Sequence, residues 1–205
     1  METQKKRNNR VNVFLNDGFA FGLDKRVVLE HGLHEGDALS DAAIEELLVS
    51  EERVRAKEKA LALLTYRARS VEELRKKLLE KGFSEASVGT TVKDLQRVGL
   101  LDDAAFASSF VRTRMADKPM SRRMLAFELR KKGVEEGVVE SAVEEEYGVD
   151  SEVEVARRLL AKRMQRYTGD PKRTKKRLAD FLGRRGFGWD VISTVLREME
   201  WETKT

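Results

Sequence analysis

One stretch of this sequence is rich enough in basic side chains to bind a polyanion. Between positions 157 and 185 there are 12 Lys and Arg residues and only two acidic ones, Asp170 and Asp180. Lys and Arg neutralise phosphates and pair with carboxylates, so this excess predicts a surface for nucleic acid or for an acidic protein face. The plainer alternative, a solvated charged face, stays open. The basic residues are Arg157, Arg158, Lys162, Arg163, Arg166, Lys172, Arg173, Lys175, Lys176, Arg177, Arg184 and Arg185.

The residues that enzymes use for chemistry are nearly absent. His31 and His34 stand beside glutamates in a predicted loop, and no matching set of metal ligands occurs elsewhere, so we interpret them as surface residues. The chain has no Cys, no Walker loop, no G-x-S-x-G elbow and no dinucleotide fingerprint, because the segment from Gly18 to Gly22 fits a hairpin. We therefore expect no enzymatic activity, no metal and no cofactor.

Aromatic and acidic side chains offer two further ways to bind a partner. Tyr147, Tyr167, Trp189 and Trp201 could stack on bases, although for Trp189 the simpler prediction is a staple that packs the final helix. Residues 134–150 carry seven acidic and no basic residues. They either balance nearby Lys and Arg or contact a basic partner surface. The glutamates of the helix predicted there are Glu135, Glu136, Glu140, Glu144, Glu145 and Glu146.

The overall composition indicates a helical, cytoplasmic protein. The chain has 205 residues, with 40 Lys and Arg against 36 Asp and Glu, and the lack of Cys excludes a disulfide framework and fits a reducing compartment. No apolar run approaches the ~20 residues that cross a bilayer, and the polar first ten residues do not resemble a secretion signal. With 37% charged residues and two Pro, we expect helices with much solvated surface.

The N-terminal part predicts a small β-hairpin. Val11, Val13 and Leu15 alternate with polar or outward positions, residues 16–18 supply turn chemistry, and the alternation resumes from Phe19 to Leu23. Residues 27–29 fit either a short third strand or a helical turn. An isolated hairpin is marginal in water, so its apolar face must pack on the helix predicted from residue 41.

An internal repeat sets the architecture of the rest of the chain. Gly82, Gly133 and Gly186 each end a predicted helix and follow basic residues. Apolar residues recur four and eight positions before each glycine, and one, six and ten positions after it. Each copy therefore predicts a three-helix unit of about 50 residues, and stacked copies predict an elongated, curved array. Asp102, Ser121 and Asp170 with Pro171 are the expected helix N-caps.

These patterns predict a mainly α fold of three tandem three-helix repeats with a small N-terminal β-hairpin. If the repeats stack regularly, the basic residues on their middle helices form one ridge along the array. The predicted divisions are a flexible basic arm (1–10), a β-hairpin cap (11–40), a long helix plus the first repeat (41–101), the second repeat (102–149) and the third repeat with its basic surface (150–205).

Three strings together resemble the RecX family of bacterial regulatory proteins of the RecA recombinase. They are the segment from Ala68 to Phe83, the segment from Gly99 to Ala107 with Phe110 to Arg112, and the segment from Glu128 to Val134. The resemblance covers about residues 54 to 200. The sequence departs from the family pattern at two places. Residues 118–123, before the second middle helix, replace a Gly-x-x-Arg-like turn, and the predicted hairpin is absent from shorter members.

The resemblance implies a regulator of homologous recombination, DNA repair and the SOS response that binds the RecA filament on DNA. It would inhibit ATP hydrolysis, strand exchange or filament growth without chemistry of its own. Expected partners are the filament and, weakly and with salt dependence, single-stranded and double-stranded DNA; no membrane is expected, and the chain is expected to be a monomer. The alternative is a non-specific DNA-binding protein with helix-turn-helix-like modules. The predicted contact residues are Arg75, Lys76, Lys77, Lys81, Arg122, Arg123, Arg130, Lys131, Lys132, Arg157, Arg158, Lys162, Arg163, Lys172, Arg173, Lys175, Lys176, Arg177, Arg184 and Arg185.

Overall fold

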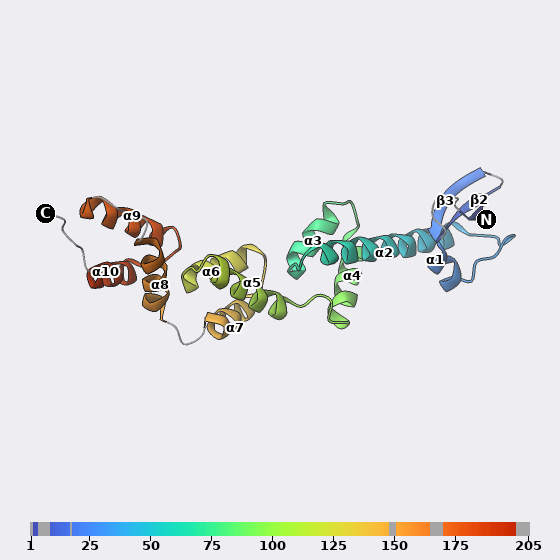
Figure 1. Ribbon diagram of the computed structural model, residues 1–205. Coiled ribbons are helices and arrows are strands. Elements are labelled where there is room, and N and C mark those ends of the chain that lie inside the picture. Colours follow the sequence, from blue (N-terminus) through green and yellow to red (C-terminus); the bar gives the residue numbers. More distant parts are fainter. Residues whose placement is uncertain (1, 4–8, 17, 148–150, 165–169, 200–205) are drawn as a thin grey trace. The chain divides into compact units, whose positions relative to one another are not determined.

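A computed structural model describes residues 2–3, 9–16, 18–147, 151–164 and 170–199 (Figure 1). The chain divides into two compact units, the first formed by residues 1–69 and 73–101 and the second by residues 70–72 and 102–205. Within the described residues, the elements in chain order are β1 (Glu2–Thr3), β2 (Arg10–Leu15), β3 (Gly18–Asp24), α1 (Lys25–Glu30), α2 (Asp41–Tyr66), α3 (Val71–Leu79), α4 (Glu85–Arg97), α5 (Asp103–Asp117), α6 (Arg122–Lys131), α7 (Glu136–Tyr147), α8 (Glu152–Met164), α9 (Pro171–Gly183) and α10 (Trp189–Glu198).

The predicted hairpin is confirmed as the pair β2 and β3. The two strands are antiparallel, with Val11 opposite Leu23 and Val13 opposite Phe21, and the register shifts after Val13. The short segment after β3 is the helix α1, so the helical alternative for residues 27–29 is correct. Part of the expected N-terminal arm is also ordered, because Glu2–Thr3 pair with β2 as the strand β1. Backbone pairing of this kind needs no side-chain pattern, and residues 4–8 lie outside the described part of the chain.

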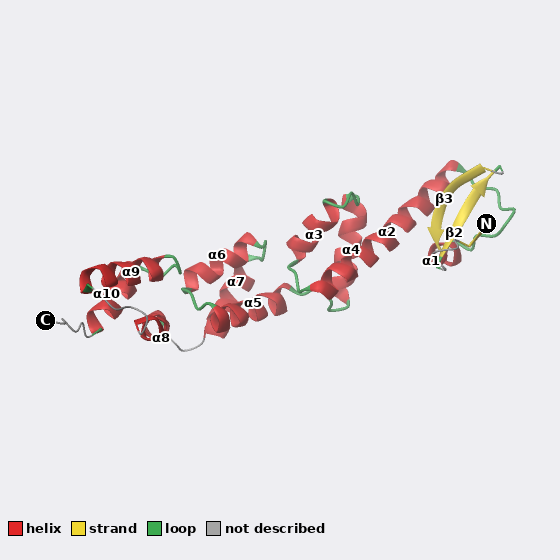
Figure 2. Ribbon diagram, turned by 45° about the horizontal axis from the view of Figure 1, so that its top comes forward, coloured by secondary structure: helices red, strands yellow, loops and turns green. Residues whose placement is uncertain are grey.

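Apolar packing and a buried ion pair fix the hairpin to α2. Val11, Val13, Leu23 and Val27 form a core cluster with Leu47 of α2. Figure 2 shows the two strands beside the start of this helix. Beside the cluster, the buried Glu51 carboxylate of α2 accepts the Asp24 N–H at 2.6 Å and pairs with the Arg10 guanidinium at 2.6 Å. The hairpin is therefore an integral part of the first unit.

The helix boundaries follow the sequence signals closely. Asp102, Ser121 and Asp170 are the N-caps of α5, α6 and α9, and their side chains accept hydrogen bonds from backbone N–H groups of the first turn. Pro171 is the first residue of α9. The three glycines predicted to end the middle helices all have positive φ angles, 83° at Gly82, 78° at Gly133 and 85° at Gly186. Glycine takes this left-handed conformation without the steric cost that a Cβ imposes. The expected three-helix repeats are thus confirmed.

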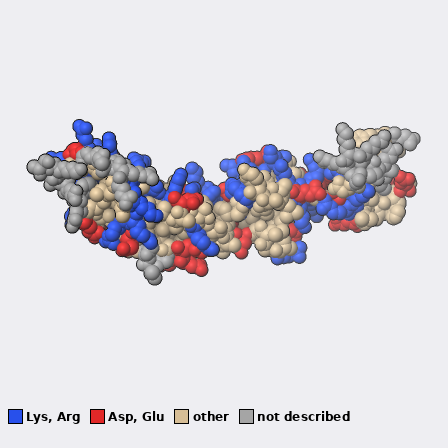
Figure 3. Space-filling model, viewed as in Figure 1, with Lys and Arg blue, Asp and Glu red and all other residues tan. Residues whose placement is uncertain are grey.

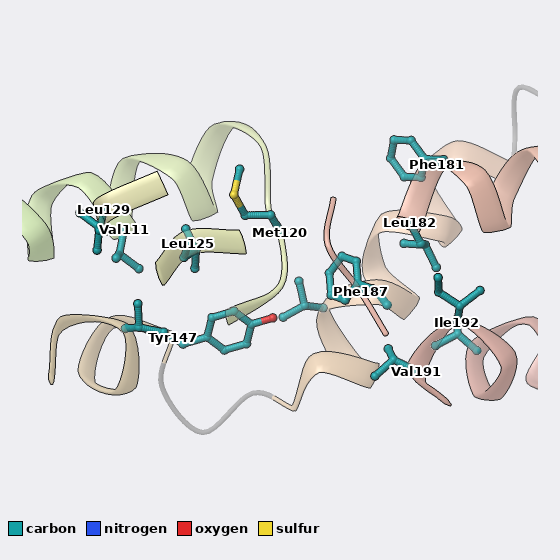
Figure 4. Packing of buried hydrophobic residues seen from close by; sticks show 14 of the residues in the cluster. Val111, Met120, Leu125, Leu129, Tyr147, Phe181, Leu182, Phe187, Val191 and Ile192 are labelled. Carbon is teal, nitrogen blue, oxygen red and sulfur yellow. The ribbon is translucent and has the colours of Figure 1, made fainter. Parts of the chain in front are cut away.

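The apolar repeat positions form the cores of these repeats. The residues four and eight positions before each glycine are fully buried: Leu74, Leu78, Leu125, Leu129, Leu178 and Leu182. In the second unit they join one continuous cluster with Val139 of α7 and Ile192 of α10, shown in part in Figure 4. Burying a leucine side chain stabilises a fold by roughly 1.5 to 3 kcal/mol. The spacing that defined the repeat therefore also defines the hydrophobic core.

Within the second unit, the end of a middle helix lies against the start of the preceding middle helix. At one junction the N–H of Ser121 donates to the carbonyl of Arg185 at 3.0 Å, and Arg185 Nη1 donates to the carbonyl of Pro119 at 3.0 Å. At the equivalent junction, the Ser70 hydroxyl donates to the carbonyl of Lys132 at 2.5 Å. The segment 118–123, which departs from the family pattern, is thus used in packing between repeats.

The junction leaves no room for a side chain at Gly186. A Cβ built there would lie 2.6 Å from Ser121 Oγ and 2.7 Å from Met124 Cβ. Gly183, three residues earlier, has open space at its Cβ position and no positive φ. The two glycines therefore allow a matched comparison within one connection.

We predict opposite effects for the two glycine-to-alanine substitutions. Gly186→Ala should lower the free energy of unfolding by about 2 to 4 kcal/mol, because it adds backbone strain and overlap with Ser121 and Met124. Gly183→Ala should leave it unchanged or raise it by up to about 1 kcal/mol, since alanine favours helix. Urea unfolding followed by circular dichroism measures both. Equal effects of the two substitutions would contradict the junction described above.

Candidate functional site

The helix α9 presents a basic face to solvent. Its buried stripe consists of Thr174, Leu178, Phe181 and Leu182, at the spacing of one side of a helix. The remaining positions carry five exposed basic residues, and Asp180 is the one acidic residue in the helix. Figure 3 shows Lys and Arg side chains gathered over this part of the chain. The five are Lys172, Arg173, Lys175, Lys176 and Arg177.

This charge pattern opposes the helix dipole. The N-terminus of a helix carries a partial positive charge, which favours acidic residues in the first turn. In α9 the first turn holds Lys172 and Arg173 and no acidic residue, although the Asp170 cap accepts their backbone N–H groups. Helix stability therefore does not account for the basic residues there. Residues that violate a local rule without a structural gain are typical of functional sites.

Four of the five α9 cations have no ion pair within the part of the chain that the structure describes. Among the described residues, Lys172, Arg173, Lys176 and Arg177 form no ion pair with a carboxylate. In the adjoining helix α8, Arg157 pairs with Glu154 at 2.9 Å and with Glu198 at 2.7 Å, so its charge is balanced internally. Arg166 lies outside the described residues. Within the described residues, α9 thus carries four cations of the third repeat that have no ion pair.

The predicted contact residues of the other repeats divide into paired and unpaired groups. Arg75 pairs with Glu85, and Lys77 with Glu80. In α6, Arg122 and Arg130 pair with glutamates of α7. Lys76, Lys81, Arg123 and Lys131 are exposed, with no ion pair among the described residues.

Most of the predicted contact residues are exposed to solvent. Whether they form one ridge through all three repeats depends on how the repeats stack, so the ridge stays a prediction. Arg75, Arg122, Lys132, Arg163 and Arg185 are half-buried, and the exposed members are Lys76, Lys77, Lys81, Arg123, Arg130, Lys131, Arg157, Arg158, Lys162, Lys172, Arg173, Lys175, Lys176, Arg177 and Arg184.

The acidic helix α7 balances neighbouring arginines. Glu144 pairs with Arg122 at 2.5 Å, Glu146 with Arg112 of α5 at 2.7 Å, and Glu136 with Arg130. The hydrogen bond from the Arg130 guanidinium lowers the pKa of Glu136 below its usual value. The balancing interpretation of this acidic segment is therefore supported. Three arginines of the second repeat are thus paired with α7, whereas four of the five α9 cations have no ion pair with a carboxylate among the described residues.

Two arginines at the end of the third repeat share one aromatic ring. The guanidinium carbons of Arg163 and Arg185 lie 4.2 Å and 4.5 Å from the centre of the Phe181 ring. Burial, together with the nearby Arg163 charge, lowers the pKa of Arg185. Cation–π contact with Phe181 and the bond to Pro119 hold Arg185 in place without a carboxylate among the described residues. This arrangement concentrates positive charge at the C-terminal end of α9.

Trp189 is exposed, which corrects the expectation that it packs the final helix. Its side chain is 71% exposed at the first position of α10, while Val191, Ile192, Val195 and Leu196 form the buried stripe. Trp189 lies three and seven positions before Ile192 and Leu196, at the edge of this stripe by helical phase, so the sequence pattern did not reveal its exposure. Tyr147 is buried, and the guanidinium carbon of Arg122 lies 4.4 Å from the centre of its ring. Tyr147 is therefore excluded as a surface on which bases stack. Tyr167 and Trp201 lie outside the described residues.

The two histidines, and the length and apolar character of the helices, bear on metal binding and membrane insertion within the described part of the chain. His31 Nε2 lies 3.0 Å from Ser50 Oγ. No group of three or more His, Asp or Glu side chains among the described residues is placed to hold a metal ion. None of the described helices combines the length and apolar character needed to cross a membrane.

Four family models match the chain in order. A model described as the regulatory protein RecX N-terminal domain matches residues 1–40. Models described as the first, second and third three-helix domains of RecX match residues 56–95, 102–143 and 150–196. Each three-helix match overlaps one of the repeats described above.

Curated relatives and solved structures show the same similarity. Regulatory protein RecX of Bacillus licheniformis is 30% identical over 203 residues, covering 98% of this chain and 77% of the relative. The Bacillus subtilis protein of the same name is 31% identical, with 98% and 76% covered. A crystal structure of regulatory protein RecX matches with a TM-score of 0.74 and 27% identity over 96% of this chain and 97% of that one. The structure of RecX from Lactobacillus salivarius matches with a TM-score of 0.60 and 25% identity, covering 73% and 97%.

The dipole argument predicts that acidic substitutions stabilise α9. The double substitution Lys172→Glu and Arg173→Glu should raise the free energy of unfolding by roughly 0.5 to 2 kcal/mol at low salt, because it places carboxylates at the positive end of the helix. The control pair Lys176→Glu and Arg177→Glu lies beyond the first turn and should change stability less. Thermal unfolding at two salt concentrations measures both pairs. A lower stability of the first pair would show that these cations serve the fold.

Proposed function

Since this chain belongs to the RecX family of regulatory proteins, we propose that it regulates the RecA recombinase without catalysing a reaction of its own. It binds the RecA filament assembled on DNA, in the cytoplasm and as a monomer, and lowers ATP hydrolysis, strand exchange and filament growth. It thereby acts in homologous recombination and DNA repair. It needs no metal or cofactor for this role.

The basic face of α9 is the observation that supports this function best. Four of its cations lack a counter-charge among the described residues, and its first turn opposes the helix dipole. A nucleoprotein filament offers phosphates and acidic side chains to such a face. A ligand shifts a conformational equilibrium by the difference in its affinity for the two states. If this protein binds one nucleotide state of the filament more tightly than another, it resists the conformational changes that ATP turnover drives.

The second candidate function is non-specific DNA binding. The same α9 face favours it, because phosphates alone satisfy basic side chains and need no recombinase. Salt dependence and partner dependence separate the two functions. A plain DNA-binding protein loses affinity steeply with salt and does not prefer recombinase-coated DNA, whereas a filament regulator acts before it covers the DNA.

The deciding experiment measures ATP hydrolysis by the cognate RecA on single-stranded DNA. The reaction is titrated with this protein, and a binding curve on the same DNA without RecA is recorded at the same salt concentration. We expect suppression at concentrations too low to coat the DNA. Suppression only at DNA-saturating concentrations would favour the second function.

Charge reversal tests the role of α9 directly. Changing Lys172, Arg173, Lys175 and Lys176 to Glu should raise the concentration needed for half-maximal ATPase suppression at least about tenfold, with helicity unchanged. The matched control reverses Lys25, Arg53, Lys57 and Lys93, four exposed basic residues of the first unit, and makes the same change in net charge. Equal losses in the two variants would mean that net charge alone matters. Wild-type suppression by the α9 variant would remove this face from the proposed function.

A further inference from the structure

The three repeats differ at one position in a way that points to a ligand. Three residues after the glycine that ends each middle helix stand Glu85, Glu136 and Trp189. In the first two repeats this glutamate pairs with an arginine of the middle helix, Arg75 or Arg130. In the third repeat the glutamate is replaced by a tryptophan. The position that pairs with a middle-helix arginine in two repeats thus carries an exposed aromatic ring in the third.

The surroundings of Trp189 are positively charged. Arg184 is exposed at the end of α9, and Arg163 and Arg185 both pack on Phe181. Arg185 and Trp189 are four residues apart, so their Cα atoms lie within about 14 Å of each other even if the chain is extended. The one acidic residue in the first turn of α10 is Asp190, whose carboxylate lies beside Gly188. Cations that can take phosphates therefore lie within reach of an exposed ring.

We propose that Trp189 is a base-stacking platform for single-stranded nucleic acid, with Arg163, Arg184 and Arg185 neutralising the adjacent phosphates. Stacking on aromatic side chains beside a basic groove is the general means by which proteins bind single strands without sequence preference. Bases in a duplex are already stacked on one another, so this site discriminates single strands from duplexes. The inference rests on the DNA contact within the proposed function and assigns the residue that recognises bases.

A nucleic acid fits the site better than an acidic protein surface does. The cations alone could hold the negative charges of an acidic protein surface. Such charges do not explain why Trp189 is 71% exposed at a position where the other repeats carry a carboxylate. A base supplies the apolar flat partner that the ring lacks, and its phosphate supplies the negative charge. Both parts of a nucleotide are therefore matched by neighbouring residues of one repeat.

The chain contains only two tryptophans, which gives a direct spectroscopic test. The variant Trp201→Phe reports on Trp189 alone, and Trp189→Phe reports on Trp201 alone. Each is titrated, without RecA and at low salt, with a thymidine oligonucleotide and with an abasic oligonucleotide of the same length and charge. We expect the thymidine oligonucleotide to quench Trp189 emission, and the abasic one to bind more weakly and without quenching. Unchanged Trp189 emission at saturating thymidine oligonucleotide would overturn the proposal.

Affinity measurements complete the test. Trp189→Ala should weaken binding of the thymidine oligonucleotide about five- to a hundredfold and leave duplex binding nearly unchanged. The matched control is Phe127→Ala, which removes another exposed aromatic ring, 58% exposed, from the second repeat. Equal losses for both variants would overturn the assignment, since they would show a general effect of surface aromatics.

The same variants separate this inference from the proposed function. If Trp189→Ala keeps its affinity for bare single strands but loses suppression of the RecA ATPase, Trp189 contacts protein and the stacking proposal is wrong. If the thymidine oligonucleotide quenches Trp189 emission, but the wild-type protein never suppresses the RecA ATPase below DNA saturation, the stacking proposal is supported and filament regulation is not.

Discussion

The second unit depends on the close approach of one middle helix to the next. At Gly186 the backbone lies so near Ser121 and Met124 that a Cβ would overlap both, and at Gly133 the side chain of Glu72 occupies the equivalent space. Glycine meets two requirements at these positions, because the helix end needs a positive φ and the junction needs the absence of a side chain. Backbone hydrogen bonding from Ser121 to Arg185 then fixes the junction.

This way of joining repeats leaves their solvent faces free to differ. The junction uses glycines, serines and carbonyl groups, and the core uses leucines that recur in every repeat. Neither requirement restricts the charge of the outward positions. The second repeat accordingly pairs Arg122 and Arg130 with glutamates of α7, whereas the third leaves most of α9 unpaired among the described residues. One scaffold thus presents middle helices whose basic residues are paired to different extents.

The basic face of α9 carries a local energetic cost that the rest of the repeat offsets. Lys172 and Arg173 stand at the positive end of the helix dipole, which disfavours them by a few tenths of a kcal/mol each. Capping by Asp170 and burial of Leu178 and Leu182 stabilise the helix by more than this. The core therefore tolerates a surface whose charges do not favour helix stability.

The sequence by itself determined the hairpin, the helix caps, the glycine stops and the leucine core, because each depends on backbone preference or on the period of one helix. Asp170, Gly186 and Leu129 could all be placed in this way. Only the tertiary structure decided which cations are free, since the pairs of Arg122 with Glu144 and Arg112 with Glu146 join residues more than 20 positions apart on different helices. It also decided that Glu2–Thr3 form a strand, through backbone pairing with β2, and that Trp189 faces solvent, because exposure depends on which sides of α10 its neighbouring helices cover.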